Sequence, residues 1–278
     1  MITVPLVRST VVAVAAVLLV SPATVGKAEK PSSPVTISAT PGEQRVRAGL
    51  PCLPAPPVDL GLTNTTGDAV YADMFVTTDD PLQLSRGMFS SYLPAKTKAT
   101  APLSVGAAYG TKPGSYAVTL QSGGRHLRVP IEVVAPPVKS PGDNLLLGER
   151  ADPSSTYVTG AQEFDPCGGV DGDRTWSTSA WNSASSGEFP DHYTVTLPKA
   201  AKMNRVDVYT HATAGMTDWD VRVLTSTGWR TVAAVRDNSA ASRGSTFAPV
   251  TATQVQIVGL DSVNHDYSRI REVEAYLA

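Results

Sequence analysis

Residues 191–198, DHYTVTLP, alternate apolar and polar side chains with a period of two. Tyr193, Val195 and Leu197 form the apolar set, and a threonine separates each from the next. Successive side chains of a β-strand point to opposite faces of the sheet, so this pattern predicts a strand with one buried face. The alternation returns at VDV (206–208), WDVRV (219–223) and QVQIV (254–258). About eight such strands predict a two-sheet sandwich, of which a jelly roll is one form.

The N-terminal half carries the same signal in a separate set of strands. Residues 115–120 and 127–133 alternate on either side of the turn at Gly123 and Gly124, which predicts a β-hairpin. Pro130 cannot donate a backbone hydrogen bond, so it predicts an edge position for the second strand. About seven strands over residues 35–134 predict an immunoglobulin-like sandwich. The fold class expected for the whole chain is therefore all-β.

The segment APPVKSPGD (135–143) has the proline, glycine and charge content of a linker between domains. We therefore expect an immunoglobulin-like domain over residues 29–136, a linker over 137–143 and a second sandwich over 144–278. The 278 residues, 42% of them hydrophobic, are enough for two ordinary cores.

The charge of the chain limits the kinds of partner that it is expected to bind. The formal net charge is −2, and the sequence contains no run of Lys and Arg residues. Proteins that bind nucleic acid draw affinity from clustered cations, so nucleic acid is not an expected partner.

The first residues have the pattern of a secretory signal peptide. Arg8 precedes the apolar run 11–20, and small residues follow it. Cleavage fits after Ala23 or after Ala28, and the sequence leaves the choice open; an uncleaved anchor is the alternative. We take residues 1–28 as the signal peptide and expect a secreted, extracellular protein.

Two cysteines, Cys52 and Cys167, remain after that segment. An oxidising compartment favours a disulfide between them, which would join the two halves of the chain. The alternative is two separately buried thiols, since a free cysteine packs as a small hydrophobic residue.

The order of motifs in the second half resembles the discoidin, or coagulation factor five/eight type C, family. The motifs, in chain order, are NLLLGERADPSST, VDGDRTW, DHYTVTLP, NRVDVYTH, DWDVRVL, GWRTVA, FAPVTATQVQIVGL and DYSRIREVEAY. They extend over residues 144–278. The resemblance implies a galactose-binding-like jelly-roll β-sandwich related to bacterial carbohydrate-binding modules, with glycan recognition by end loops and a structural calcium ion. In the first half, KPGSYAVTL resembles immunoglobulin-like accessory domains of bacterial glycoside hydrolases, which implies a spacing or supporting role.

The loop VDGDRT has the chemistry that calcium needs. Its glycine lets backbone carbonyls turn inward while the neighbouring carboxylates supply charge. The family resemblance assigns the ligands Asp171, Asp173, Thr175 and Glu272, with Glu274 as the alternative to the last. An Asx-type turn closed by side-chain hydrogen bonds is the other interpretation of this loop.

Sugar binding needs an aromatic face for the C–H face of a pyranose and planar polar groups for its hydroxyls. Among the predicted loops, the candidates with that chemistry are Trp181, Asn182, His211, Arg236, Asn238 and His265. Trp181 lies in a serine-rich segment and is the predicted platform, although a core position is an equal alternative. Trp176, Trp219 and Trp229 fall on or beside predicted strands and are assigned to the core. Many sugar-binding relatives place Arg and Asn where this chain has His211, Met216 and Thr217, so galactose is in doubt as the ligand.

Motifs for nucleophilic, zinc or nucleotide chemistry are not found in the sequence. If the protein hydrolyses glycosides, the candidate carboxylate pairs are Glu163 with Asp165 and Glu188 with Asp191. That chemistry depends on the distance between the two carboxyl groups, which a sequence does not supply. The sequence therefore predicts a secreted, non-catalytic protein that binds a glycan or polysaccharide. The alternatives are an adhesive protein that grips a protein or lipid headgroup, with membrane contact not favoured, and a hydrolase.

Overall fold

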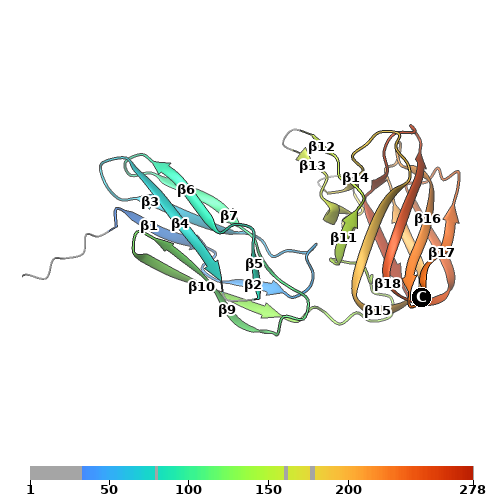
Figure 1. Cartoon of the computed structure of the whole chain (residues 1–278), viewed down its shortest axis with the longest axis horizontal. Helices are drawn as coiled ribbons and strands as arrows, with labels where there is room; N and C mark the ends of the chain where they lie inside the picture. Colours follow the sequence, from blue (N-terminus) through green and yellow to red (C-terminus); the bar gives the residue numbers. More distant parts are fainter. Residues whose placement is uncertain (1–32, 79–80, 160–161, 176–178, 278) are drawn as a thin grey trace, which may run out of the picture. The chain divides into compact units, whose positions relative to one another are not determined.

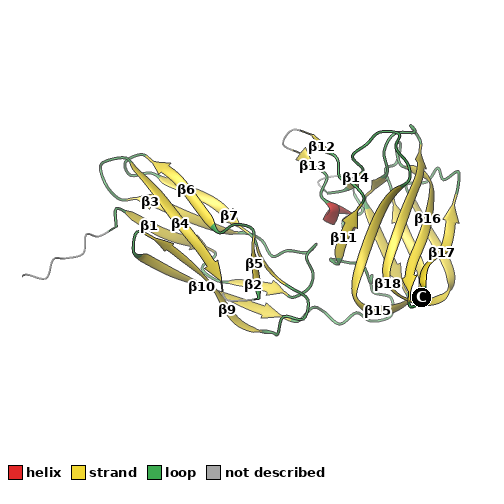
Figure 2. Ribbon diagram, viewed as in Figure 1, coloured by secondary structure: helices red, strands yellow, loops and turns green. Residues whose placement is uncertain are grey.

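A computed structural model describes residues 33–78, 81–159, 162–175 and 179–277. These residues form β-strands joined by loops, with one 3-10 helix, η1, at Pro166–Gly169 (Figure 2). The predicted all-β class is confirmed. Residues 1–28, predicted as the signal peptide, lie outside the described residues, as does Trp176.

Among these described ranges, no helix has both the length and the hydropathy of a membrane span.

The N-terminal region is built from two facing sheets (Figure 1). One has the strand order β1-β3-β7, and the other has the order β2-β10-β9-β4-β6, with β5 paired to β8 beside them. The strands are β1 (Val35–Thr40), β2 (Gln44–Arg47), β3 (Val58–Asn64), β4 (Val70–Thr78), β5 (Leu82–Leu84), β6 (Met88–Leu93), β7 (Lys98–Leu103), β8 (Val105–Ala107), β9 (Gly114–Ser122) and β10 (Arg125–Val134).

Alternation along these strands places one apolar set in a shared core. Leu60 and Leu62 of β3 and Met74 of β4 are fully buried, and both sheets contribute to the same cluster. The predicted hairpin is β9 and β10, which pair antiparallel throughout. Strand β10 pairs with β2 only from Ile131 onward, so Pro130 lies where β10 has no partner on that side. The sheet edge expected from Pro130 is therefore local to the first part of β10.

The C-terminal region forms a second sandwich, whose strand order is β11-β15-β18-β16-β17 with β20 paired to β15. Two short pairs, β12-β13 and β14-β19, flank it. The strands are β11 (Arg150–Pro153), β12 (Val158–Thr159), β13 (Gln162–Glu163), β14 (Trp181–Asn182), β15 (Asp191–Tyr209), β16 (Met216–Thr225), β17 (Gly228–Val235), β18 (Ser242–Ser262), β19 (Arg269–Ile270) and β20 (Glu272–Tyr276).

Strands β15 and β18 are long enough to contribute to both layers of the sandwich. The first part of β15 pairs with β11 and the end of β18, whereas its last five residues pair with β20. Breaks in register after Thr196 and Met203 separate the two parts. Val195 from the first part and Val208 from the second are both fully buried in the same core, so the two parts of β15 pack against one hydrophobic cluster.

Trp219 and Trp229 were both predicted to be core residues, and the structure describes both of them. Trp219 is fully buried, as predicted. Trp229 is not a core residue: it is 38% exposed, and the guanidinium of Arg222 lies 5.5 Å from its ring centre. The residue faces outward because it pairs with Leu224, which alternates with the buried Val223.

The predicted disulfide between Cys52 and Cys167 is present. Cys52 lies in the loop after β2, is 3% exposed and packs in the C-terminal core cluster. Its amide donates to the carbonyl of Gly148 at 3.1 Å. Gly148 has φ +75, in the left-handed region, and a Cβ there would meet Leu53 at 2.7 Å, so this position requires glycine.

Candidate functional site

Four loops meet at one end of the C-terminal sandwich. Loop 210–215 joins Tyr209, which pairs with Ser242, to Met216, which pairs with Ser262. Backbone hydrogen bonds from Asn238 to the carbonyl of Thr217 and from Val263 to the carbonyl of Gly215 bring the neighbouring loops to the same place. The loops that follow or precede these residues therefore leave the sheets at the same end. A backbone hydrogen bond from Ser183 to the carbonyl of Ser268 brings in the fourth loop. We call loops 183–190, 210–215, 236–241 and 263–268 the end-loop surface.

Arg269 joins two loops of the end-loop surface. Its guanidinium donates to both carboxylate oxygens of Asp266 at 2.8 Å and to the carbonyl of Ala214 at 2.7 Å. The hydrogen bonds from Arg269 hold the pKa of the Asp266 carboxyl well below its usual range, and the Tyr267 amide and Ser262 hydroxyl act in the same direction. Loops 210–215 and 263–268 are thus joined by a charged group with little exposure, which favours a rigid surface.

An aromatic cluster lies beside that clamp. The ring of Tyr267 is 5.2 Å from the Arg269 guanidinium carbon and 5.4 Å from the ring of Tyr157, which in turn lies 5.9 Å from Phe164. All three rings are half-buried, so each has an accessible part. Sequence reasoning missed Tyr267 as a binding candidate. The available signal was its place in a loop two residues before an arginine.

His211 lies in the loop that Arg269 holds. Its Nδ1 accepts hydrogen bonds from the amides of Thr213 at 3.3 Å and Ala214 at 3.1 Å, which places the proton of the neutral ring on Nε2. Burial lowers the pKa of His211, and the charges of Arg271 and Arg269 lower it further. The imidazole is therefore neutral at physiological pH, a form suited to hydrogen bonding with uncharged ligands.

His265 occupies the tip of the last loop. Its backbone has φ +53, and its side chain is 80% exposed. Nδ1 lies 2.8 and 2.9 Å from the two carboxylate oxygens of Asp261. Burial acts to raise the pKa of Asp261, but hydrogen bonds from His265 and the Ser262 amide outweigh it and lower the pKa. The carboxylate thus fixes the orientation of an exposed imidazole.

Arg236 and Asn238 hold loop 236–241 in place. The Arg236 guanidinium donates to Asp220 at 2.7 Å and to the carbonyl of Trp219 at 3.0 Å. The Asn238 amide donates to the carbonyls of Met216 at 3.3 Å and Ala240 at 2.8 Å. Both residues also line a polar hollow of about 660 Å³ between the end of β17 and the start of β18.

Trp181 and Asn182 do not lie on this surface, which corrects their assignment as ligand-binding residues. Trp181 is 1% exposed, packs 5.1 Å from the ring of Tyr193 and donates its indole N–H to the carbonyl of Ser155. Asn182 is 5% exposed. The pairing of β14 with β19 places both residues beneath the loops, so the indole offers no face to a sugar.

The loop predicted to bind calcium has the form of two successive Asx turns. Asp171 Oδ1 accepts from the Asp173 amide at 2.8 Å, and Asp173 Oδ1 accepts from the amide and hydroxyl of Thr175 at 2.7 Å. Gly172 has φ +90, which favours glycine at this turn. The hydrogen bonds of an Asx-type turn, the other interpretation of this loop, are therefore present. The carboxylates of Asp171 and Asp173 keep further lone pairs, which can also coordinate a cation.

Glu272 is the buried carboxylate next to this loop. It is 0% exposed and accepts from the Gly172 amide at 3.2 Å and the Asn144 side chain at 3.4 Å. Burial raises the pKa of Glu272 to about 8; the Gly172 amide opposes this, and the charge of Asp171 adds to it. Of these acids only Glu272 is buried, and in the described parts of the chain no three His, Cys, Asp or Glu side chains are grouped so that they could hold a metal ion. A cation beside Glu272 would stabilise its charge and that of Asp171.

Glu274 has a different set of partners. Arg174 forms two hydrogen bonds with its carboxylate at 2.8 and 2.9 Å, and the Tyr276 hydroxyl donates to it at 2.8 Å. Of the two glutamates considered as calcium ligands, Glu272 therefore faces the loop, and Glu274 is satisfied by protein groups.

The carboxylates considered for catalysis are placed as follows. Glu188 is exposed, whereas Asp191 is 5% exposed at the start of β15. Asp165 caps η1 by accepting from the Cys167 amide at 2.8 Å. The side chain of Glu163 lies outside the described residues.

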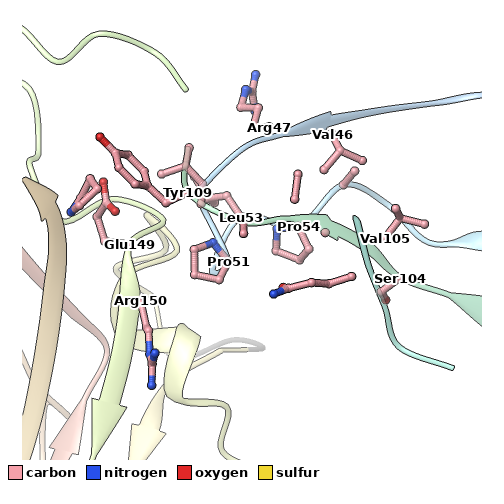
Figure 3. A pocket seen from close by; sticks show the side chains of 18 of the residues that line it. Val46, Arg47, Pro51, Leu53, Pro54, Ser104, Val105, Tyr109, Glu149 and Arg150 are labelled. Carbon is pink, nitrogen blue, oxygen red and sulfur yellow. The ribbon is translucent and has the colours of Figure 1, made fainter. Parts of the chain in front are cut away.

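Figure 3 shows a separate hollow of about 640 Å³. Its lining includes apolar side chains such as Val46, Leu53 and Val105, together with Glu149. The Glu149 carboxylate forms an ion pair with Lys139 at 2.9 Å. Burial raises the pKa of Glu149, and the hydrogen bond and charge of Lys139 oppose that rise. This carboxylate is therefore already partnered within the protein.

Part of the C-terminal region is similar to a known protein family. Residues 168–257 match the model of an F5/8 type C family described as NedA-like, galactose-binding domain. The second sandwich has the galactose-binding-like jelly-roll fold that the motif order predicted, and its residues 168–257 are similar to the F5/8 type C family. No curated protein matches the chain by sequence.

Solved structures similar to this chain cover about half of it. Chitosan-binding module 1 of a chitosanase/glucanase from Paenibacillus sp. IK-5 is 27% identical, covers 48% of this chain and 98% of its own, and has a TM-score of 0.43. The family 32 carbohydrate-binding module of Streptococcus pneumoniae EndoD is 18% identical, covers 49% and 100%, and has a TM-score of 0.41. The family 32 module of Clostridium perfringens NanJ, in complex with galactose, is 19% identical, covers 46% and 92%, and has a TM-score of 0.38.

Proposed function

We propose that this protein is a secreted, non-catalytic glycan-binding protein whose end-loop surface recognises uncharged sugar units. The observation that carries the proposal is the clamp of Arg269 and Asp266, which holds the ring of Tyr267 beside the loop of His211. An aromatic ring next to fixed polar groups supplies both kinds of contact that a pyranose needs.

The family match supports this proposal, since residues 168–257 fall in a galactose-binding domain family. The low pKa of His211 supports it as well, because a neutral imidazole exchanges hydrogen bonds with hydroxyls without requiring a charged partner. Tyr267 replaces Trp181 as the proposed aromatic platform, and Tyr157 supports the Tyr267 ring from the side.

Binding to a membrane or to an apolar protein surface is the competing function. Val158 and Val263 are 60% and 51% exposed and are the large apolar side chains that the described parts of loops near this end present to solvent. Two valines offer far less apolar surface than the groups of Leu, Phe or Trp that would favour membrane insertion. The balance of chemistry therefore favours sugar.

The same proposal includes a structural calcium ion. Asp171, Asp173, Thr175 and Glu272 would hold it, with carbonyls of the Gly172 turn completing the oxygen ligands. The ion would join the 171–175 loop to β20 and offset the charge crowded around Glu272. It would supply structural support rather than contact the sugar.

The N-terminal sandwich is proposed to be an immunoglobulin-like spacer. The order β1-β3-β7 opposite β2-β10-β9-β4-β6, with β2 parallel to β10, supports that assignment. The disulfide between Cys52 and Cys167 supports an oxidising, extracellular location.

A glycan array tests the proposal directly. The full chain should bind a subset of neutral glycans in calcium, and Tyr267→Ala should lose that binding while it remains folded at the temperature of the array. The control is Trp229→Ala, which removes an exposed aromatic ring at the start of β17, the end of the strand away from loop 236–241. Absence of binding to every neutral glycan by the folded wild-type chain would contradict the proposal.

A further inference from the structure

The outer face of β4 and β6 in the N-terminal sandwich exposes a row of aromatic side chains with a polar centre. Tyr71 is 85% exposed, and Phe75, Met88 and Tyr92 are each slightly more than half exposed. Large apolar groups in such number are unusual on an open sheet face, and they mark an interaction surface. We call this surface the β4–β6 aromatic face; it consists of Tyr71, Asp73, Phe75, Met88, Ser90 and Tyr92.

Strand register arranges the six residues in three pairs. Tyr71 pairs with Tyr92, and their ring centres lie 4.9 Å apart. Phe75 pairs with Met88 at the other end. The two apolar pairs are four residues apart along β4, which is about 13 Å at the rise of a β-strand.

The middle pair is polar. Asp73 lies opposite Ser90, whose hydroxyl donates to Asp73 Oδ1 at 2.6 Å, and both residues are exposed. The face therefore presents, in order along the strand, an aromatic pair, a hydrogen-bonding pair and an apolar pair. Gln121 of β9 adds an exposed amide beside Phe75.

We propose that the β4–β6 aromatic face binds a neutral, β-linked polysaccharide chain, at a site separate from the end-loop surface. Such a chain is a flat ribbon whose C–H faces stack on aromatic rings and whose hydroxyls point to its edges. The distance between the two apolar pairs matches the length of a di- to trisaccharide segment. This site goes beyond the function proposed for the C-terminal domain.

The central carboxylate distinguishes this occupant from a second copy of the chain. A symmetric dimer places the same patch on both sides of its interface, so Asp73 at the centre would face Asp73 of its partner. Two carboxylates would then be buried together without a cation, which is strongly unfavourable. A glycan instead offers hydroxyl donors to the same carboxylate.

Charge also argues against the other classes of partner. The six residues include one carboxylate and no cation, so phosphate groups of nucleic acid or anionic lipid would be repelled. An apolar protein partner would leave the charge of Asp73 without an opposite charge at the centre of the contact, where protein interfaces are depleted of charged residues. A neutral polymer with many hydroxyls fits both the aromatic ends and the polar centre.

Retention on insoluble polysaccharide tests the proposal. The probes are chitin and cellulose, and the protein is the full chain, washed in the presence and absence of free galactose. The variant Tyr71→Ala/Tyr92→Ala removes this tilted tyrosine pair, and because both rings are exposed, it should fold normally. Tyr109→Ala is the matched control, since Tyr109 is a 55% exposed tyrosine outside the face.

We expect the wild type to be retained on at least one of the two polymers, and the double variant to bind about tenfold more weakly. Tyr109→Ala should bind as the wild type does. Equal retention of the wild type and the double variant, or no retention of either, overturns the proposal. A change in sedimentation of the double variant without a change in retention also overturns it, because a second copy would then be the occupant.

The outcome can be separated from that of the end-loop surface. Tyr267→Ala leaves the β4–β6 aromatic face intact, so its retention should match the wild type. If Tyr267→Ala abolishes retention and the Tyr71→Ala/Tyr92→Ala variant does not, then the end-loop surface alone binds the polymer, and the second site is rejected.

Discussion

Arg269 and Asp266 form two parallel hydrogen bonds, each of 2.8 Å, in which the guanidinium meets both oxygens of the carboxylate. The pair links the base of β19 to the last loop, and the guanidinium also holds the carbonyl of Ala214. A bidentate pair of this kind restricts orientation as well as distance. The end-loop surface is therefore organised before any ligand arrives, which reduces the entropy lost on binding.

The clamp should make stability depend on pH in the acid range. Asp266 has a pKa lowered by Arg269, so its contribution is present above the unfolded value of about 3.9 and is lost as the pH falls. We expect Asp266→Asn to destabilise the protein by about 1–3 kcal/mol at neutral pH. Chemical denaturation from pH 7 downward measures this difference. It should narrow below about pH 4; a difference that stays constant across that range would contradict the assignment.

Calcium should stabilise the chain through Glu272. Removal of the ion by chelator should lower the melting temperature, and Glu272→Gln should abolish the response to calcium. Glu188→Gln, which changes an exposed glutamate, is the control. Differential scanning calorimetry of all three proteins, with and without chelator, gives the answer. An unchanged calcium response in Glu272→Gln would remove this residue from the ligand set.

The calcium response should also increase with pH. In the absence of the ion, burial raises the pKa of Glu272 to about 8, so the folded state holds a proton that calcium must displace. A raised carboxyl pKa favours the folded state at low pH, and this contribution is lost as the pH rises from about 4 to about 8. Calcium titrations at several pH values in this interval should therefore show tighter binding and proton release at the higher values. Affinity independent of pH would contradict this coupling.

The disulfide should contribute substantially to stability. Cys52 and Cys167 are separated by 115 positions in the sequence, and a cross-link of that length restricts the unfolded chain by roughly 4 to 5 kcal/mol in the chain-entropy model. Cys52→Ala/Cys167→Ala should melt at a lower temperature than the oxidised wild type. Thiol labelling of the native wild-type protein should detect no reactive cysteine. Two reactive thiols before reduction would show that the bridge is absent in solution.

Trp181 should affect stability rather than recognition. Its indole is buried against Tyr193 and bonded to Ser155, so Trp181→Ala should cost about 3–5 kcal/mol. Trp181→Phe keeps most of the volume and should retain glycan binding at temperatures where it is folded. Loss of glycan binding by a fully folded Trp181→Phe would contradict this prediction and would indicate that the indole takes part in binding.

The alternation of side chains was sufficient to predict the fold class. It identifies strands such as β9, β10 and the first part of β15, because a half-buried strand requires a period of two. The pairing of Cys52 with Cys167 was also accessible, since two cysteines have one partner each. Strand order and the breaks within β15 were not, because they depend on contacts between distant segments.

The binding surface was only partly predictable, for a physical reason that Trp181 and Trp229 illustrate. Composition around Trp181 is loop-like, yet the short pair β14-β19 buries it, whereas the strand that carries Trp229 turns it outward. Local sequence does not determine which face of a strand meets the core. Tyr267 was missed for the same reason: its role follows from contact with Arg269 and Tyr157.

Titration calorimetry with the neutral glycan that binds most strongly on the array tests the central claim most directly. The full chain in calcium should release heat on binding one glycan at the end-loop surface, Trp229→Ala should match it, and Tyr267→Ala should bind at least about tenfold more weakly while it remains folded. Equal affinity of Tyr267→Ala and the wild type would contradict the account.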